Sequence, residues 1–295
     1  MKKGMIFMIL SGICFAIVNF FVKLLGPVHT DGFGELQSYP AHELVLARSI
    51  VSFAISLFII KRLKIPVFGN NKKWLIIRSL AGMIALTVFF NTVHHLPLAI
   101  AVTVQYLAPI FTIIFAMVLL KEKVRLLQWL FIGVTFSGVL LISFSKGNPN
   151  VAHGEVSMFW IGLGLISAVL SGVAYVAIMK LRTTDAPITI VFYFPMVSIP
   201  FMVVLCFFDF TIPQGIEWLY LLIIGIFTQL AQITMTKALH QGAASSIIPF
   251  QYIGAVYAFL VGYYIFAETL SNTILLGIVL VLSGVIINAF LRKAK

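Results

Sequence analysis

Residues 91–143 read NTVHHLPLAIAVTVQYLAPIFTIIFAMVLLKEKVRLLQWLFIGVTFSGVLLIS, and this stretch decides the fold. It contains two apolar runs, at 98–120 and 127–144, which are separated by a short segment rich in Lys and Arg. A helix of about 20 mostly apolar residues crosses the hydrocarbon core of a membrane, which is about 30 Å thick. The connection between the runs is too short for a soluble domain. The stretch therefore predicts two consecutive transmembrane helices.

The same pattern fills the chain. Of its 295 residues, 61% are hydrophobic and 10% are charged, whereas an ordinary soluble domain is about 25% charged. The 27 phenylalanines argue against a disordered chain, and continuous apolar runs favour helices over the alternating strands of a barrel. We therefore predict an all-α integral membrane protein with ten transmembrane helices, at 5–25, 41–60, 74–93, 98–120, 127–144, 157–178, 188–208, 217–236, 243–266 and 273–291.

The distribution of charge predicts the orientation of these helices. If both termini lie in the cytoplasm, 17 of the 20 Lys and Arg residues lie on the cytoplasmic side. Arg78 is one of these 17 residues. The exceptions are Lys23 and Lys146, on the opposite side, and Arg48, inside the second span. Most acidic residues lie opposite the basic ones. Because Lys and Arg are retained on the cytoplasmic side, we expect both termini in the cytoplasm and the chain in the cytoplasmic membrane.

The sequence also contains an internal repeat, with a register of 146 residues. Chance similarity is the alternative interpretation, because apolar sequences match one another easily, but here residues recur in blocks. Five spans per repeat is an odd number, so the second copy enters the membrane from the opposite side. We expect two inverted repeats, at 1–147 and 148–295, with a solute site between them. The matches include His94 with His240, Gln105-Tyr106 with Gln251-Tyr252, Glu122 with Glu268, and Ser137-Gly138-Val139 with Ser283-Gly284-Val285.

These residues carry a resemblance to the EamA-type half of the drug/metabolite transporter superfamily. Residues 91–143 resemble it in the proline within a helix (Pro109), the glutamate that closes the helix (Glu122) and the glycine-rich helix that follows. Residues 237–288 resemble it again, although Ala255 stands where the first half has Pro109. The resemblance implies a carrier of small metabolites in a bacterial cytoplasmic membrane, and export of the solute. It does not identify the solute.

Polar residues inside the predicted spans are the candidates for a solute-binding cavity. In the eighth span, spacings of three and four residues place Gln229, Gln232 and Thr236 on one helix face. Amides and hydroxyls can bind a zwitterion or a nucleobase edge, and tyrosine adds a stacking face. The alternative is that these groups join helices, at about 0.6–2 kcal/mol per contact. The full candidate set is Asn91, Gln105, Tyr106, Gln229, Gln232, Thr236, Gln251 and Tyr252.

Three charged residues near or within spans are interpreted as structural or interfacial. Arg48 lies roughly 10 Å from the outer end of its span; it would attract an anionic solute group, but we favour an arginine that reaches the interface or pairs with Glu43. Glu122 and Glu268 end spans, so we favour acids that accept backbone N–H groups over proton-coupling carboxylates. Lys23 is interpreted as an interfacial anchor.

The function predicted from these features is secondary transport of a small metabolite, an amino acid or related solute, by alternating access. A passive channel, or a scaffold or receptor with the same helices, is the alternative. A membrane-embedded enzyme is the least expected, because the chain has no G-x-S-x-G or H-E-x-x-H motif and no Asp within a predicted span. We expect no metal site and no cofactor. The expected partners are the solute and the lipid bilayer, not nucleic acid, and the oligomeric state is left open.

Overall fold

The computed structural model describes residues 2–27, 36–120, 157–241, 253–266, 268 and 271–291, with short pieces at 130, 133–134, 137–138 and 141. The candidate residues Glu122, Gln251 and Tyr252 lie outside the described residues. Every regular element within the described part is a helix. These helices are α1 (Lys2–Leu24), α2 (Ala41–Leu63), α3 (Lys72–His95), α4 (Leu98–Gln105), α5 (Ala108–Leu120), α7 (Met158–Leu181), α8 (Pro187–Cys206), α9 (Glu217–His240), α11 (Ile253–Tyr264) and α12 (Asn272–Leu291).

The helices have the length and composition of membrane spans. Within the described residues, seven segments are long and apolar enough to cross a membrane, and α4 and α5 together form one of them. Large apolar side chains cover the outside of the molecule; Phe207 and Phe208, for example, are 83% and 84% exposed. Because lipid replaces water around such a surface, the chain is an all-helical membrane protein. The count of ten helices stays a prediction.

Local sequence sets several helix ends. Asn71 caps α3, and its side chain accepts a hydrogen bond from the Trp74 N–H at 3.4 Å. Pro187 stands at the first position of α8, where a missing N–H costs no hydrogen bond. Lys64 ends α2 in the left-handed conformation, with φ 54°, and its N–H turns back toward Ile60 and Lys61.

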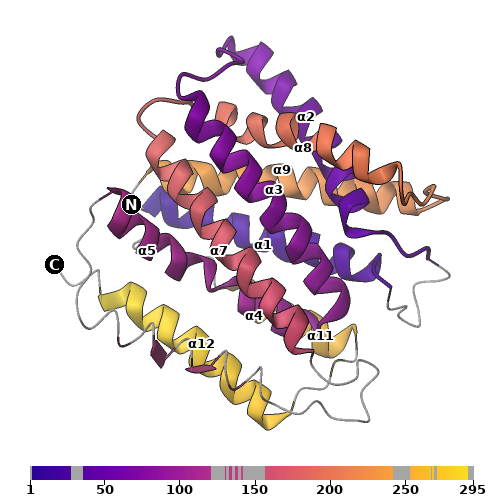
Figure 1. The fold of residues 1–295 in the computed structure, drawn as a ribbon, viewed down its shortest axis with the longest axis vertical. Helices are drawn as coiled ribbons and strands as arrows, with labels where there is room; N and C mark the ends of the chain where they lie inside the picture. The colour runs from indigo at the N-terminus through magenta and orange to yellow at the C-terminus, as the bar shows by residue number, and fades with distance from the viewer. Residues whose placement is uncertain are drawn as a thin grey trace.

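One predicted span is broken in the middle. The run 98–120 forms α4 and α5, which are separated at Tyr106–Leu107. Pro109 explains the break, because it has no N–H to donate to the carbonyl of Gln105 and its ring crowds that carbonyl. In Figure 1 the chain changes course between the two labels. The break places Gln105 and Tyr106 at an interruption in a membrane helix, where side chains of a solute site are often found.

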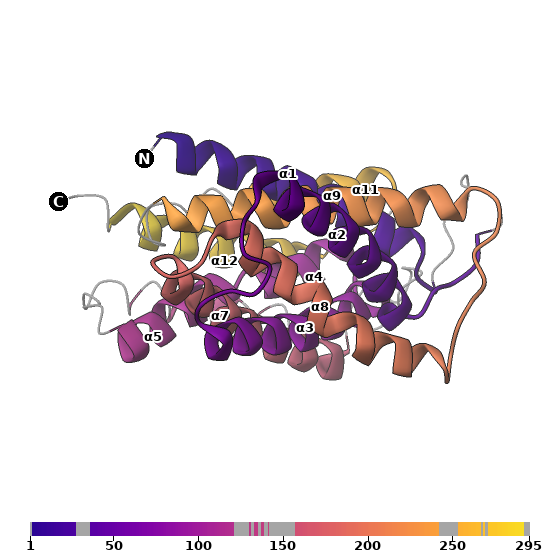
Figure 2. The same cartoon turned by 90° about the horizontal axis from the view of Figure 1, so that it is seen from above.

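The helices pack in two layers that are related by exchange of the two halves of the chain. α1 packs on α9 and α7 packs on α3, as Figure 2 shows from above. The other contacts pair in the same way: α2 with α9 matches α8 with α3, and α1 with α11 matches α7 with α4 and α5. The contacts of α2 with α8 and of α4 with α11 each join two corresponding helices, so exchange of the halves leaves them unchanged. The contacts of the described helices thus pair α1 with α7, α2 with α8 and α3 with α9.

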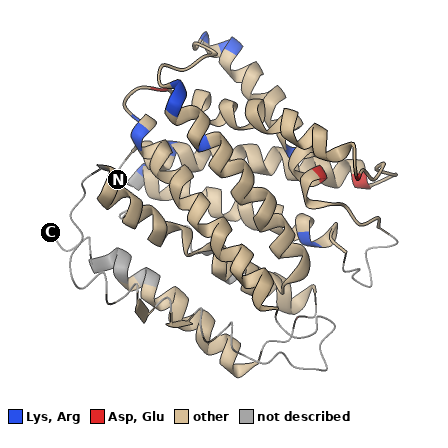
Figure 3. Ribbon diagram, in the orientation of Figure 1, with Lys and Arg blue, Asp and Glu red and all other residues tan. Residues whose placement is uncertain are grey.

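Helix ends show that α1 and α7 run in opposite directions. The end of α3 stacks on the start of α7, through His95 and Trp160 with ring centroids 3.8 Å apart. Lys23, at the end of α1, contacts Leu96 just after α3. α1 therefore ends on the face where α7 begins. Figure 3 shows most Lys and Arg gathered at one end of the helices, and Asp and Glu mainly at the other.

A carboxylate joins the two halves at each end of the molecule. At the basic end, Asp185, between α7 and α8, accepts the backbone N–H of Asn70, between α2 and α3, at 2.6 Å. At the opposite end, Glu217, at the start of α9, accepts the N–H of Gln37 at 2.7 Å and the hydroxyl of Tyr39 at 2.5 Å. Burial raises the pKa of the Tyr39 hydroxyl above its usual range, and the hydrogen bond to Glu217 raises it further. Exchange of the halves also exchanges these two loop pairs.

Candidate functional site

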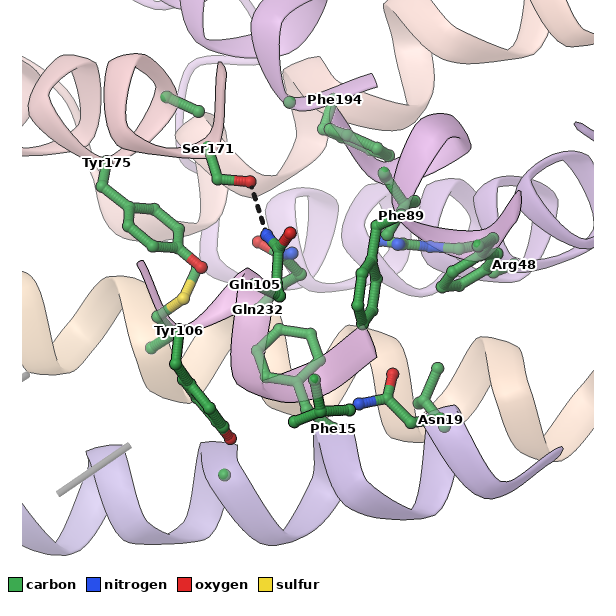
Figure 4. A pocket seen from close by; sticks show the side chains of 18 of the residues that line it. Phe15, Asn19, Arg48, Phe89, Gln105, Tyr106, Ser171, Tyr175, Phe194 and Gln232 are labelled. Atoms are coloured by element: carbon green, nitrogen blue, oxygen red, sulfur yellow. Dashed lines mark hydrogen bonds between the residues drawn. The ribbon is translucent and has the colours of Figure 1, made fainter. Parts of the chain in front are cut away.

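A cavity of about 110 Å³ lies between the two layers (Figure 4). A volume of this size holds several water molecules. Its wall is formed by residues of α1, α2, α3, α4, α7, α8 and α9, and so by both halves of the chain. The polar side chains of the wall are Asn19, Arg48, Arg78, Gln105, Tyr106, Ser171, Tyr175 and Gln232, and the aromatic ones include Phe15, Phe89, Phe90 and Phe194.

Two arginines are the charged side chains among the described residues of the cavity wall. Arg48 on α2 is 1% exposed and Arg78 on α3 is 3% exposed. Their guanidinium carbons lie 4.9 and 5.1 Å from the centroid of the same Phe194 ring, which allows a cation–π contact with each. Arg78 also donates from Nη2 to Oε1 of Gln232 on α9, at 2.8 Å.

No acidic side chain in the described part of the chain pairs with either arginine. The ion pair found among the described residues is Lys23–Glu268, and none of the described residues that line the cavity is acidic. Nε of Arg48, and Nε and Nη1 of Arg78, have no hydrogen-bond partner in the described part of the chain. Burying an unpaired ion costs several kcal/mol, so this arrangement needs a compensating group or water in the cavity.

The position of Arg48 differs from the expected interfacial one. Arg48 does not pair with Glu43, whose Oε2 instead accepts the N–H of Thr211 at 2.9 Å. Arg78, which the sequence placed with the cytoplasmic charges, is likewise in the cavity wall. The sequence contained an indication that Arg78 lies inside the membrane. It is six residues beyond Lys72, the start of α3, which is about 9 Å along the helix. That distance already carries a side chain out of the headgroup region.

Gln105 lies in the cavity wall and is fixed by α7. Its Nε2 donates to Oγ of Ser171 at 2.8 Å, and its Oε1 accepts from Oγ of Ser167 at 2.9 Å. The same Ser167 hydroxyl lies 2.7 Å from the Ala85 carbonyl of α3. These contacts tie α4 to α7 just before the helix break. Tyr106, at the break, also lines the cavity, and its hydroxyl extends toward Gly254 of α11.

The other described members of the predicted binding set do not line this cavity. Asn91 donates to the Thr87 carbonyl of its own helix at 2.9 Å. Gln229 donates to Oγ of Ser56 at 2.7 Å and so joins α9 to α2. Thr236 is fully buried, and its hydroxyl has no partner among the described residues. The structure thus brings together Gln105, Tyr106 and Gln232.

Asn19 is a cavity residue that the sequence analysis missed. It lies on α1, is 9% exposed and faces the cavity across from Arg48. No hydrogen bond from its amide is found within the described residues. A signal was present, since Asn19 is a single amide within a long apolar span and such residues mark functional positions by default.

A buried ion pair joins the end of α1 to the segment before α12. Nζ of Lys23 lies 3.5 Å from Oε1 of Glu268 and donates to the Leu96 carbonyl at 2.7 Å. Both side chains are 2% exposed or less, so Lys23 is not the interfacial anchor that we expected. Glu268 accepts the Leu98 N–H at the start of α4, at 2.8 Å. Burial raises the pKa of Glu268, and Lys23 and Leu98 oppose the shift.

These features define a class of protein. A helical membrane protein with a polar cavity between two exchangeable halves has the architecture of a membrane transporter. A crystal structure with this fold superposes with a TM-score of 0.70 over 100% of this chain and 99% of the other, at 16% identity.

Comparison with protein families then identifies the chain. Residues 2–144 and 158–290 each match the EamA-like transporter family, and the protein belongs to that family. It is 27% identical to the pseudopaline exporter CntI of Pseudomonas aeruginosa, over 87% of this chain and 85% of that one. It is 29% identical to an uncharacterized transporter of Helicobacter pylori, over 99% and 97% of the two chains. A riboflavin transporter of Vibrio cholerae is 24% identical, over 96% and 91%.

Proposed function

We propose that this membrane transporter is a secondary carrier, which moves a small metabolite by alternating access. The cavity is the observation that carries the proposal. It is buried, it is polar in part, and both family-matched halves contribute to its wall. A site between halves of opposite direction can face one side of the membrane and then the other as the halves tilt.

The architecture that we propose for this carrier is ten transmembrane helices in two inverted repeats, at 1–147 and 148–295. Exchange-related packing of the described helices supports the repeat, and the opposite directions of α1 and α7 support the inversion. We place the basic end of the molecule and both termini in the cytoplasm of a bacterial cell, because positive residues gather at that end.

The direction and the site belong to the same proposal. One similar protein is named an exporter, and we propose export here as well. Gln105, Tyr106 and Gln232 remain our candidates for solute binding because they line the cavity. Gln251 and Tyr252, outside the described residues, stay candidates by their repeat position. Asn91, Gln229 and Thr236 are withdrawn from the binding set.

Transport by proteoliposomes tests the carrier. Purified protein is reconstituted into vesicles loaded with a small-molecule extract of bacterial cytoplasm, and mass spectrometry identifies the compounds that leave. A carrier releases a few compounds at a rate that saturates, and each released compound shows counterflow when it is supplied outside. Release without saturation or counterflow would indicate a passive channel instead.

A cavity variant and a matched control locate that transport. Gln232→Ala removes the amide that holds Arg78, and we expect about a tenfold lower rate, since one charge-assisted hydrogen bond is worth about 1.5–3 kcal/mol. Gln241→Ala, in the exposed turn that follows α9, is the control and should transport as the wild type does. Equal transport by both variants would remove the cavity from the proposal.

A further inference from the structure

We propose that the cavity binds an organic anion, and that Arg48 and Arg78 together hold a carboxylate group of the solute. The inference rests on the proposed transport function and names the chemical class of its solute. It starts from the two cations that the cavity contains and from the absence of acidic residues among the described residues of its wall.

Burial gives the first argument. Both arginines are less than 4% exposed, and both carry guanidinium nitrogens with no partner in the described part of the chain. A buried arginine stays charged and is stable when an anion and hydrogen-bond acceptors surround it. The described protein provides one acceptor, the Gln232 amide oxygen, and no anion. A solute carboxylate supplies both missing elements.

The geometry of the two guanidinium groups gives the second argument. Each guanidinium carbon lies about 5 Å from the centroid of the Phe194 ring, and both side chains line the same cavity. Gln232 holds one end of Arg78 and leaves Nε and Nη1 as free donors. Nε and Nη1 lie on different edges of the guanidinium, so each can donate one charge-assisted hydrogen bond to an anionic oxygen. Phe194 and Gln232 thus hold Arg78 in the cavity wall with donors left for an acid group.

The rest of the wall fits the uncharged body of such a solute. Phe15, Phe89 and Phe90 provide apolar surface, and Asn19 provides an amide without a partner among the described residues. A cavity with a few convergent polar groups on an apolar wall is the usual form of a small-molecule site. The charged end of the solute would therefore lie between α2, α3 and α8, and its body would extend toward α1.

A matched series of small molecules tests the class of solute. Succinate, succinamate and succinamide have nearly the same size and carry two, one and no negative charges; phenylacetate and phenylacetamide form a second pair. Binding to the purified full-length protein is measured by thermal shift and calorimetry. We expect succinate, succinamate and phenylacetate to stabilise the protein. Succinamide and phenylacetamide, which carry no charge, should bind with a Kd at least about tenfold higher.

Arginine variants assign the effect to the cavity. Arg48→Gln and Arg78→Gln should each weaken acid binding by about tenfold or more, while Arg62→Gln, the same change on the exposed end of α2, should leave it unchanged. Arg48→Lys keeps the charge but loses the planar fork, so it should bind the acids with intermediate affinity. Gel filtration reports whether each variant is folded.

The outcomes separate this inference from the transport function. Equal affinity for acids and amides, undiminished acid binding by both glutamine variants, or no acid that binds better than its amide would each overturn the anion site. If proteoliposomes still exported a neutral or cationic compound with saturation and counterflow, the carrier would stand without the anion site. If no compound showed saturable transport, the carrier itself would fail.

Discussion

Lys23 and Glu268 form a pair whose energetics differ from those of surface ion pairs. Both are almost completely buried, and each also bonds to the backbone around the start of α4. Removing one partner of such a pair strands the other charge in a low-dielectric environment, and this costs more than the pair itself contributes. The pair also joins α1 to the segment before α12, which makes its integrity a measure of how the halves are held at the acidic end.

A double-mutant cycle at this pair is the residue-scale prediction. Lys23→Met should lower the free energy of unfolding by about 3–5 kcal/mol, because it leaves Glu268 buried and unpaired. Glu268→Gln keeps an acceptor for Leu98, and the double variant should lose less than the sum of the single losses. The measurement is chemical unfolding in detergent, with Lys3→Met on the exposed turn of α1 as control. Additive losses would show that the two charges do not interact.

Individual residues were predictable from the sequence only as far as their helix face. The spacing of Gln229 and Gln232 gave the polar side of α9, but these residues lie three positions apart, on adjacent parts of that side. Gln229 meets Ser56 of α2, whereas Gln232 meets Arg78 and the cavity. The neighbours of a helix face are set by tertiary packing, which one sequence does not contain. The same limit concealed the convergence of Arg48 and Arg78.

At the scale of elements, close helix contacts depend on small residues. A Cβ built on Gly225 of α9 would lie 2.5 Å from Cβ of Val51 on α2. The Cβ of Val51 cannot move unless α2 moves with it. The close approach of α2 and α9 therefore requires glycine at position 225. Pro109 also acts at the scale of elements, because it separates α4 from α5. This proline was recognised in the sequence. The sequence did not give the position of the break, since the chain turns at Tyr106–Leu107, before the proline.

Substitution at Gly225 is the element-scale prediction. Gly225→Ala should destabilise the protein by about 1–3 kcal/mol, because the added methyl overpacks the contact of α9 with α2. Gly162→Ala is the matched control: no atom lies within 4 Å of its added Cβ, so it should stabilise α7 slightly through higher helix propensity. Thermal unfolding in detergent measures both. A Gly225→Ala protein as stable as the wild type would show that α2 and α9 separate at little cost.

For the whole molecule, composition and the apolar runs were sufficient to predict an all-helical membrane protein, and the motifs were sufficient for the family. The order of the layers was not predictable, because it depends on which apolar faces meet, and lipid-facing and buried faces are equally apolar. Polar loops are a better guide. Asp185 and Glu217 each join one loop of each half, at opposite ends of the molecule.

Orientation in the membrane is the prediction at this scale. Phe68, between α2 and α3, and Phe208, after α8, are 66% and 84% exposed at opposite ends. In a background with Cys14 and Cys206 changed to serine, Phe208→Cys should react with a membrane-impermeant maleimide in intact bacteria. Phe68→Cys should react only after the cells are permeabilised, because its end carries the basic residues. The reverse pattern would place both termini outside.

The contact of Arg48 and Arg78 with Phe194 also bears on how charge is shared between the two halves. In the register of 146 residues, Phe194 corresponds to Arg48, and Ile224 corresponds to Arg78. Both arginines among the described residues of the cavity wall therefore belong to the first half, and the corresponding positions of the second half are uncharged. The two family-matched halves thus contribute unequal charge to the described wall of the cavity. A solute with one charged end would keep that end toward the first half in both the inward-facing and the outward-facing state.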